Sequence, residues 1–207
     1  RSVAEQHSVQ LALNILNDRK YNALRDALYQ CESEKTRFRR LLINAVMATD
    51  LIDQELKNLR NTRWSKAFRE VADDEENTNK QQAMNRKATI VIEHIIQASD
   101  VAHCMQHWHV FCKWNEKLFV EMYGAYREGR ADRDPSVGWY EGEICFFDNY
   151  VIPLAKKLEE CGVFGVSSDE YLSYALANRR EWKIKGERIT EDMIRRTKAA
   201  ATGEEQD

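Results

Sequence analysis

Two aspartates stand at the ends of long apolar runs, and they are the acids best placed to do chemistry. Asp100 follows the run 91–99, and Asp50, preceded by Thr49, closes the stretch 41–48. A carboxylate at the end of a buried helix needs a partner, which either a metal ion or the amides of a helix cap can supply. The sequence therefore predicts either one acidic pocket shared by both aspartates or two ordinary helix caps.

Histidines close to Asp100 permit a metal-binding interpretation. Asp100, His103 and His107 are spaced by three and four residues, which places them on one face if a single helix continues through them. Two histidines one turn apart are a pair of ligands that zinc accepts. The competing interpretation is that a bend after Asp100 breaks this face, and that the histidines pack as ordinary residues beside Trp108 and Phe111.

Other familiar catalytic patterns do not stand out. We find no phosphate-cradling glycine loop and no Ser–His–Asp order. Five scattered cysteines without a CxxC pair predict free thiols in a reducing compartment.

Helices must position these candidates, because apolar residues recur at spacings of three and four along most of the chain. Ser2 and Glu5 have the spacing of a capping box at the first helix start. The helix that includes 90–96 is apolar on so many faces that we expect it to be central. The polar stretch 72–83 predicts a surface loop. We expect helices over 3–16, 21–31, 33–49, 51–71, 84–100, 101–127, 139–161 and 168–182. We expect core positions at Trp108, Phe111, Trp114, Phe119, Tyr123 and Tyr126.

Composition narrows the class of protein. The 207 residues carry 31 Lys+Arg and 34 Asp+Glu, a net charge of −3, which does not favour nucleic-acid binding. Eight glycines and two prolines are too few for an all-β sandwich or barrel. No apolar run approaches the ~20 residues of a membrane span. We therefore expect an all-α domain in the cytoplasm, over residues 1–188, followed by a charged tail over 189–207.

Six short stretches occur in an order that resembles the class I 3′,5′-cyclic-nucleotide phosphodiesterases. These stretches are SVAEQ, VMATD, IIQASD, Trp114 fourteen positions after Asp100, EICFFDNYVIPL and NRREW. The corresponding family stretches read S-V-L-E-N-H-H, V-L-A-T-D, H-C-A-D, Trp, Q-V-G-F-I-D-Y-I-V-H-P-L and N-R-E-W. The resemblance covers roughly residues 2–182 and implies the compact all-helical fold of the HD phosphohydrolase group.

The resemblance also implies a reaction and residue roles. Two divalent metals, zinc with magnesium or manganese, would activate a hydroxide that attacks a cyclic phosphate. Asp100 matches a metal ligand, Glu5 matches an acid that holds metal-bound water, and Thr49 and Asp50 match polar residues near that water. Phe146 matches the aromatic residue that stacks on the purine.

Departures from the family pattern qualify this comparison. The histidine motifs that supply the general acid and the other metal ligands precede the matched part. The resemblance thus implies a C-terminal part of a catalytic domain that lacks its N-terminal helices, with Asp100 as its one protein ligand and with no activity alone. Gln97 replaces the family histidine, His103 replaces a smaller substrate-contacting residue, and the loop 129–142 is shorter.

Glu143 replaces the family glutamine that hydrogen-bonds the purine. An ionised carboxylate only accepts hydrogen bonds, and guanine offers two adjacent donors where adenine offers one. This substitution predicts a preference for cGMP over cAMP. The alternative is a Glu143 whose tip faces solvent and which merely begins a helix.

Two other functions remain open on the sequence. The chain can belong to a non-catalytic helical interaction module, or to another metal phosphohydrolase of the HD group that shares Asp100 but lacks the Phe146 contact. The sequence does not fix the oligomeric state, the metal or any membrane attachment of the whole protein.

Overall fold

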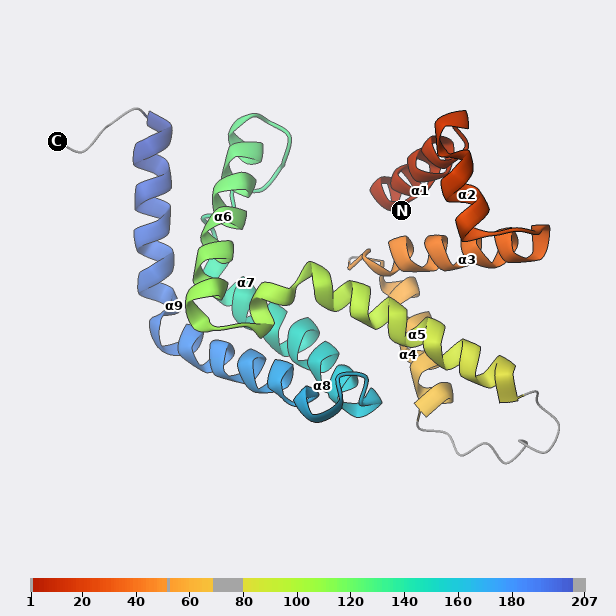
Figure 1. Ribbon diagram of the computed structural model, residues 1–207. Coiled ribbons are helices and arrows are strands. Elements are labelled where there is room, and N and C mark those ends of the chain that lie inside the picture. The colour runs from red at the N-terminus through yellow and green to blue at the C-terminus, as the bar shows by residue number, and fades with distance from the viewer. Residues whose placement is uncertain (1, 52, 69–79, 203–207) are drawn as a thin grey trace. The chain divides into compact units, whose positions relative to one another are not determined.

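The computed structural model describes residues 2–51, 53–68 and 80–202. Within these ranges the regular secondary structure is helical and contains no strand, which confirms the all-α prediction. No helix in the same ranges is both long and apolar enough to cross a bilayer. The helices, shown in Figure 1, are α1 Val3–Leu16, η1 Arg19–Tyr21, α2 Asn22–Leu28, α3 Glu32–Ala48, α4 Gln54–Phe68, α5 Lys80–Asp100, η2 Ala102–Met105, α6 Trp108–Arg127, α7 Trp139–Phe146, η3 Phe147–Val151, α8 Ile152–Cys161, η4 Gly165–Ser167 and α9 Glu170–Thr202.

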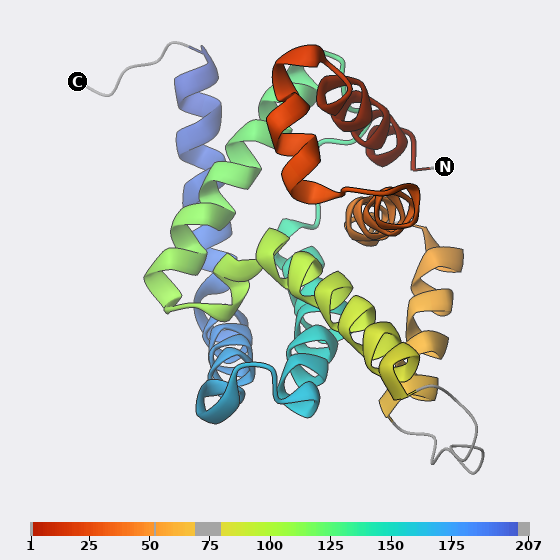
Figure 2. The same cartoon turned by 45° about the vertical axis from the view of Figure 1, so that its right-hand side comes forward.

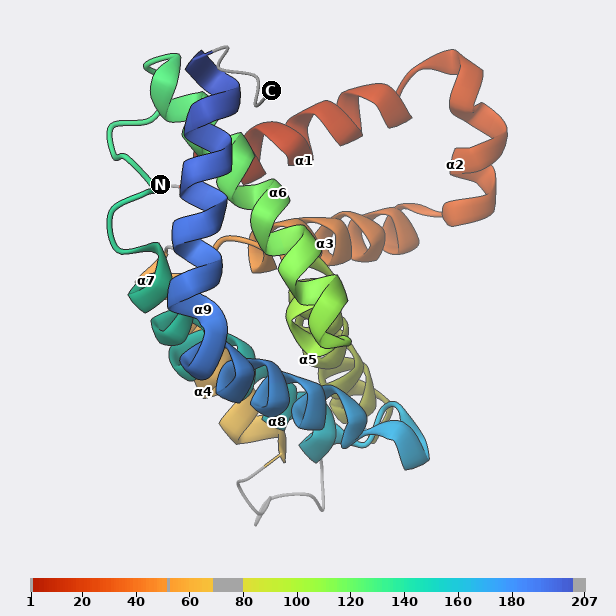
Figure 3. The same cartoon turned by 90° about the vertical axis from the view of Figure 1, so that its left-hand side faces the viewer.

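Two compact units divide the chain, Arg1–Asp100 and Val101–Asp207. In the first unit, α3 packs against α1, α2 and α5, and α4 packs against α5. Figure 2 shows α4 beside α5, and Figure 3 shows α1 and α3 side by side with α2 at one end of both. The ends of α3 and α1 are therefore held in one unit.

The buried face of α5 differs from the one that the sequence predicts. Ile90 is buried, but Ile92 is 36% exposed, and the other buried positions of this helix are Glu93, His94, Gln97 and Ala98. Two of these polar side chains have specific partners. Glu93 accepts hydrogen bonds from Arg63, and the His94 ring packs on Trp64. Pairing therefore offsets the desolvation of these groups, and the polar side of α5 faces inward.

Helix α5 also begins earlier than predicted. Residues 80–83 of the predicted loop 72–83 are the first residues of α5, while 72–79 lie outside the described residues.

The second unit is organised around α9. This helix contacts η2, α6, α7 and α8, and it bends part-way along its length in Figures 1 and 3. Phe111 and Trp182 are fully buried and meet edge to face with ring centroids 5.4 Å apart, and Phe147 packs on Phe111 at 5.2 Å. This aromatic cluster joins α6, η3 and α9.

The aromatic residues of α6 are only partly in the core. Phe111 and Phe119 are fully buried as predicted, but Trp114 is 50% exposed and Tyr126 is 37% exposed. Residues 111, 115 and 119 share one face through their spacing of four, and 114 lies on a neighbouring face. The prediction of a core position was therefore wrong for Trp114 and Tyr126.

Two predicted boundaries change. The predicted helix 139–161 consists of α7, a wider π-helical turn η3 and α8, which follow one another without a loop. The last helix was expected to end near Trp182, yet α9 continues to Thr202. Thr190 and Met193 in this extension are buried, so the charged segment has an inward face.

Candidate functional site

An acidic pocket of about 510 Å³ lies in the first unit. Glu5 from α1 and Asp50 from the α3–α4 connection both line it, so the structure brings these two predicted site residues together. The complete lining is Ser2, Val3, Ala4, Glu5, Asp50, Asp53, Gln54 and Glu55. Four carboxylates facing one pocket make an environment that attracts hard cations and ordered water.

Asp50 is the most constrained acid of this pocket. Its side chain is buried, Oδ2 accepts a hydrogen bond from Ser2 Oγ at 2.5 Å, and Oδ1 accepts one from the backbone N–H of Asp53 at 3.0 Å. Arg60 donates to the Asp50 carbonyl at 3.1 Å. Both carboxylate oxygens thus have protein donors, and Asp50 fixes the connection between α3 and α4.

The predicted capping box at Ser2 does not form. Ser2 has a left-handed backbone, with φ 53°, and its side chain makes no capping hydrogen bond to α1. The hydroxyl instead bonds Asp50, 48 residues away. Because this contact connects distant segments, the local S-x-x-E spacing could not predict it.

Thr49 is engaged with its own helix. Its hydroxyl donates to the carbonyl of Val46 at 2.8 Å, close to the end of α3. Thr49 is half-buried and is not among the residues that line the acidic pocket.

Asp100 is the last residue of α5 and has an exposed side chain. Partial desolvation raises the pKa of its carboxyl. The helix face that the sequence offered through Asp100, His103 and His107 is broken, because His103 lies in η2 and His107 precedes α6. Within the described residues, no three His, Cys, Asp or Glu side chains group so as to hold a metal ion.

Glu143 lies in the second unit, in the middle of α7. Gly138 has a left-handed backbone at φ 77° and starts this helix. The Glu143 side chain is half-buried, which contradicts the solvent-facing alternative. Burial raises the pKa of Glu143 to about 7, although a hydrogen bond from Asn115 opposes this rise. The carboxyl is therefore close to half protonated at neutral pH, whereas the sequence argument assumed an ionised group.

The two other predicted residues of this unit lie in aromatic surroundings. Phe146 is half-buried and stacks on Tyr150, with ring centroids 5.3 Å apart and 14° between planes. The His103 ring lies parallel to that of Phe111 at 6.4 Å. Burial lowers the pKa of His103, so its imidazole is neutral near pH 7.

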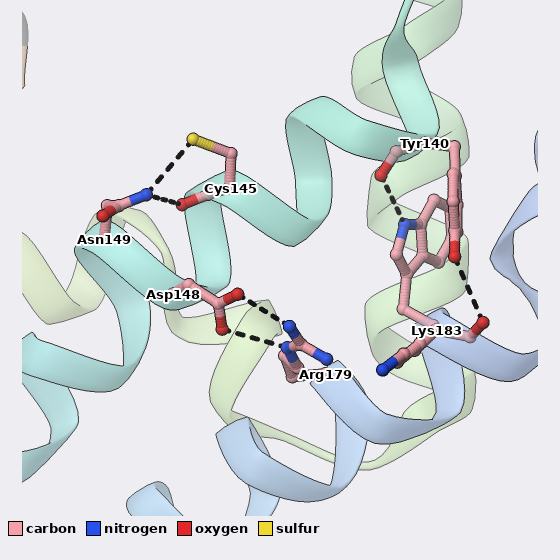
Figure 4. A network of polar contacts seen from close by, with 7 residues as sticks. Tyr140, Cys145, Asp148, Asn149, Arg179 and Lys183 are labelled. Atoms are coloured by element: carbon pink, nitrogen blue, oxygen red, sulfur yellow. Dashed lines mark hydrogen bonds and ion pairs between the residues drawn. The ribbon is translucent and has the colours of Figure 1, made fainter.

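A polar network holds α7 and η3 on α9 (Figure 4). Asp148 accepts a bidentate ion pair from Arg179, with distances of 2.9 and 2.7 Å. Tyr140 donates to the Lys183 carbonyl, and the Trp182 indole donates to the Tyr140 carbonyl, both at 3.1 Å. These contacts tie the helix turns that carry Glu143 and Phe146 to the longest helix of the unit.

A family model for the 3′,5′-cyclic-nucleotide phosphodiesterases matches residues 1–163. This match spans well over half of the chain. The chain belongs to this phosphodiesterase family. Among curated proteins, none matches it.

Two solved phosphodiesterase domains show the same fold. Both come from the rhodopsin–phosphodiesterase fusion protein of the choanoflagellate Salpingoeca rosetta. They share 22% and 21% sequence identity with this chain, cover 94% of it and superpose with a TM-score of 0.63. The chain spans 58% and 57% of their length.

Sequence reasoning missed three polar residues of this phosphodiesterase chain. Ser2 and Asp53 bond to Asp50, and Asn115 bonds to Glu143. Asn115 carried a detectable signal, because it shares the helix face of Phe111 and Phe119 and a polar residue on a core face needs a partner. Asp53 caps α4 through hydrogen bonds from two backbone N–H groups.

Proposed function

We propose that this chain forms part of a catalytic domain that hydrolyses a 3′,5′-cyclic nucleotide to the 5′-monophosphate in cyclic-nucleotide signalling. The match of residues 1–163 to the phosphodiesterase family carries the proposal. Because the chain spans less than three fifths of the matched domains, activity requires residues beyond it. Their histidine motifs would supply the general acid and further metal ligands.

The described residues fit one part of a metal centre. Bound divalent metals, zinc together with magnesium or manganese, would supply an activated hydroxide and neutralise phosphate charge. The donor set of this chain is carboxylate oxygen, which suits magnesium or manganese better than zinc. Asp100 presents an exposed carboxylate at the end of α5 and is our proposed ligand.

The acidic pocket would support such a centre by holding water. Glu5 lines the pocket, where its carboxylate can accept hydrogen bonds from water. Asp50 stiffens the wall, since both of its oxygens are engaged by Ser2 and Asp53. Thr49 contributes by ending α3 directly before Asp50.

Phe146 and Glu143 would recognise the base. Tyr150 supports one face of the Phe146 ring, and a purine would stack on the opposite face. Ionised Glu143 accepts from the two donors of guanine, whereas protonated Glu143 both donates and accepts. Preference for cGMP over cAMP should therefore grow as pH rises above about 7, which is the pKa of Glu143. Neutral His103 would complete the wall as a substrate contact.

The deciding experiment is hydrolysis of cAMP and cGMP, measured side by side with Mg²⁺ or Mn²⁺, by the full-length protein that carries this chain. We expect metal-dependent hydrolysis that Asp100→Ala abolishes and that Asp132→Ala, an acid in an exposed loop, leaves unchanged. A folded protein that hydrolyses neither nucleotide would instead indicate a non-catalytic helical module. A Glu143→Gln variant with an unchanged cGMP/cAMP ratio of kcat/KM would contradict the assignment of specificity.

A further inference from the structure

Asn115 lies between two side chains of α7 and contacts both. It is 2% exposed and comes from α6. Its Oδ1 accepts a hydrogen bond from the Trp139 indole N–H at 3.1 Å. Its side chain also hydrogen-bonds Glu143, and this contact lowers the pKa of the carboxyl, as a donor to the carboxylate does.

The Trp139 contact determines which way the Asn115 amide points. An indole N–H is only a donor, so it selects the amide oxygen of Asn115. The amide nitrogen, which is only a donor, is then left to face Glu143. A flipped amide would set its N–H₂ against the indole N–H and its oxygen against the carboxylate, and both contacts would be repulsive.

Packing holds Trp139 and Glu143 in this arrangement. The Trp139 ring meets Phe119 edge to face at 5.1 Å, and Phe119 is fully buried. On the other side, the fully buried Cys104 of η2 lies close enough to Glu143 for the carboxylate charge to raise the pKa of the thiol, in addition to the effect of burial. Asn115 and Cys104 thus face Glu143 from α6 and η2.

We propose that Asn115 is a positioning residue: anchored by the Trp139 indole, it donates to Glu143 and fixes the orientation of that carboxyl toward the purine edge of a bound cyclic nucleotide. The proposal rests on the proposed function for its ligand, but the relay Trp139–Asn115–Glu143 stands on the geometry of the second unit. With one carboxylate lone pair engaged by Asn115, the remaining acceptors of Glu143 have a defined direction.

The first test measures the relay without any nucleotide. The titration of Glu143 is followed by the carboxyl ¹³C chemical shift in the 207-residue chain. Asn115→Leu removes the donor and should raise the pKa of Glu143 by roughly one unit. Trp139→Phe keeps the aromatic contact with Phe119 but releases the amide, and should raise that pKa by a smaller amount. Tyr140→Phe removes a hydroxyl from the next position of α7 and should leave it unchanged.

The second test adds cGMP and cAMP, at pH 8, and measures the ratio of their dissociation constants by NMR titration. Both relay variants should reduce the preference for cGMP, by up to about tenfold for Asn115→Leu. If Asn115→Leu does not fold, Trp139→Phe carries the test, because it removes only the indole N–H from the relay.

The two tests fail in distinguishable ways. A Glu143 pKa that is the same in wild type and in the folded relay variants overturns the proposal. A shifted pKa in a chain that binds neither nucleotide supports the relay and counts against the proposed function.

Discussion

Individual charged residues are buried in this protein only where a partner is present. Glu93 is 2% exposed and accepts two hydrogen bonds from Arg63 Nη1, at 2.9 and 3.1 Å. Burial raises the pKa of Glu93, and the charges of Arg63 and Arg60 oppose this rise. The ion pair therefore keeps an inward-facing carboxylate tolerable, rather than adding a large net stabilisation.

Loss of Arg63 should destabilise the chain in a pH-dependent way. Arg63→Met leaves Glu93 buried without its main cation and should lower the free energy of unfolding by about 2 kcal/mol at pH 8. Because the folded pKa of Glu93 is already raised and rises further in the variant, the stability of the folded state is retained at low pH and lost as pH increases through that pKa. The loss should thus be smaller at pH 5. Urea unfolding at both pH values measures it.

A matched control for this prediction is Arg86→Met on the exposed side of α5, which should change stability by less than about 0.5 kcal/mol. Equal losses for Arg63→Met at pH 5 and pH 8 would contradict the role given to Glu93.

At this scale the sequence predicts residues better than their contacts. The resemblance selected Glu5 and Asp50, and the structure places both on one pocket. It did not predict that Ser2 would bond Asp50, since these residues are 48 positions apart. Arg63 and Glu93 are likewise 30 positions apart. Tertiary packing creates such pairs, and helical periodicity contains no information about them.

Among the helices, α9 depends most on a single glycine. A Cβ built on Gly186 would lie 2.6 to 2.9 Å from three ring atoms of Trp182. The Trp182 ring is fully buried and bonded to the Tyr140 carbonyl, so it has little freedom to move away. The missing side chain of Gly186 lets this ring lie flat along the helix.

Gly186→Ala should therefore destabilise the protein by about 1–3 kcal/mol, despite the higher helix propensity of alanine. Gly124→Ala in α6 is the matched control, because nothing lies within 4 Å of its added Cβ. That variant should gain up to about 1 kcal/mol. Thermal unfolding of the two variants gives the comparison, and a stabilised Gly186→Ala would show that Trp182 can move.

Helix order was predictable because apolar residues recur at three and four positions, but two boundaries were not. The extension of α9 to Thr202 carries many charges, which indicated a tail, yet Thr190 and Met193 are buried on one face. The inward face of α5 was predicted from its isoleucines, whereas Glu93 and His94 occupy it. In both helices, pairing or packing with another element overrode local composition.

Over the whole molecule, the free thiols report which parts are open to solvent. None of the five cysteines is in a disulfide, as the sequence predicted. Cys31 and Cys145 are exposed, Cys112 and Cys161 are half-buried, and Cys104 is fully buried. Their chemistry differs as well, because the Ser33 hydroxyl lowers the pKa of Cys31 while burial raises that of Cys112 to about 11.

These differences predict an order of thiol labelling in the native chain. Cys31 should react first with an alkylating reagent at pH 8, since exposure and a lowered pKa both favour attack by its thiolate. Cys112 should be slow, because a pKa of about 11 leaves roughly one thiol in a thousand ionised at that pH. Cys104 should react only when the second unit unfolds, because its sulfur has no exposed surface.

Mass spectrometry of peptides after timed alkylation, at increasing urea concentration, measures all five rates at once. The labelling rate of Cys104 should follow the unfolding transition, whereas that of Cys31 should change little with urea. A Cys31→Ser variant controls for effects of the first modification on the other sites. Labelling of Cys104 in native buffer at the rate of Cys145 would contradict the packing of η2 against α6 and α9, and with it the surroundings of Glu143 on which base recognition is proposed to depend.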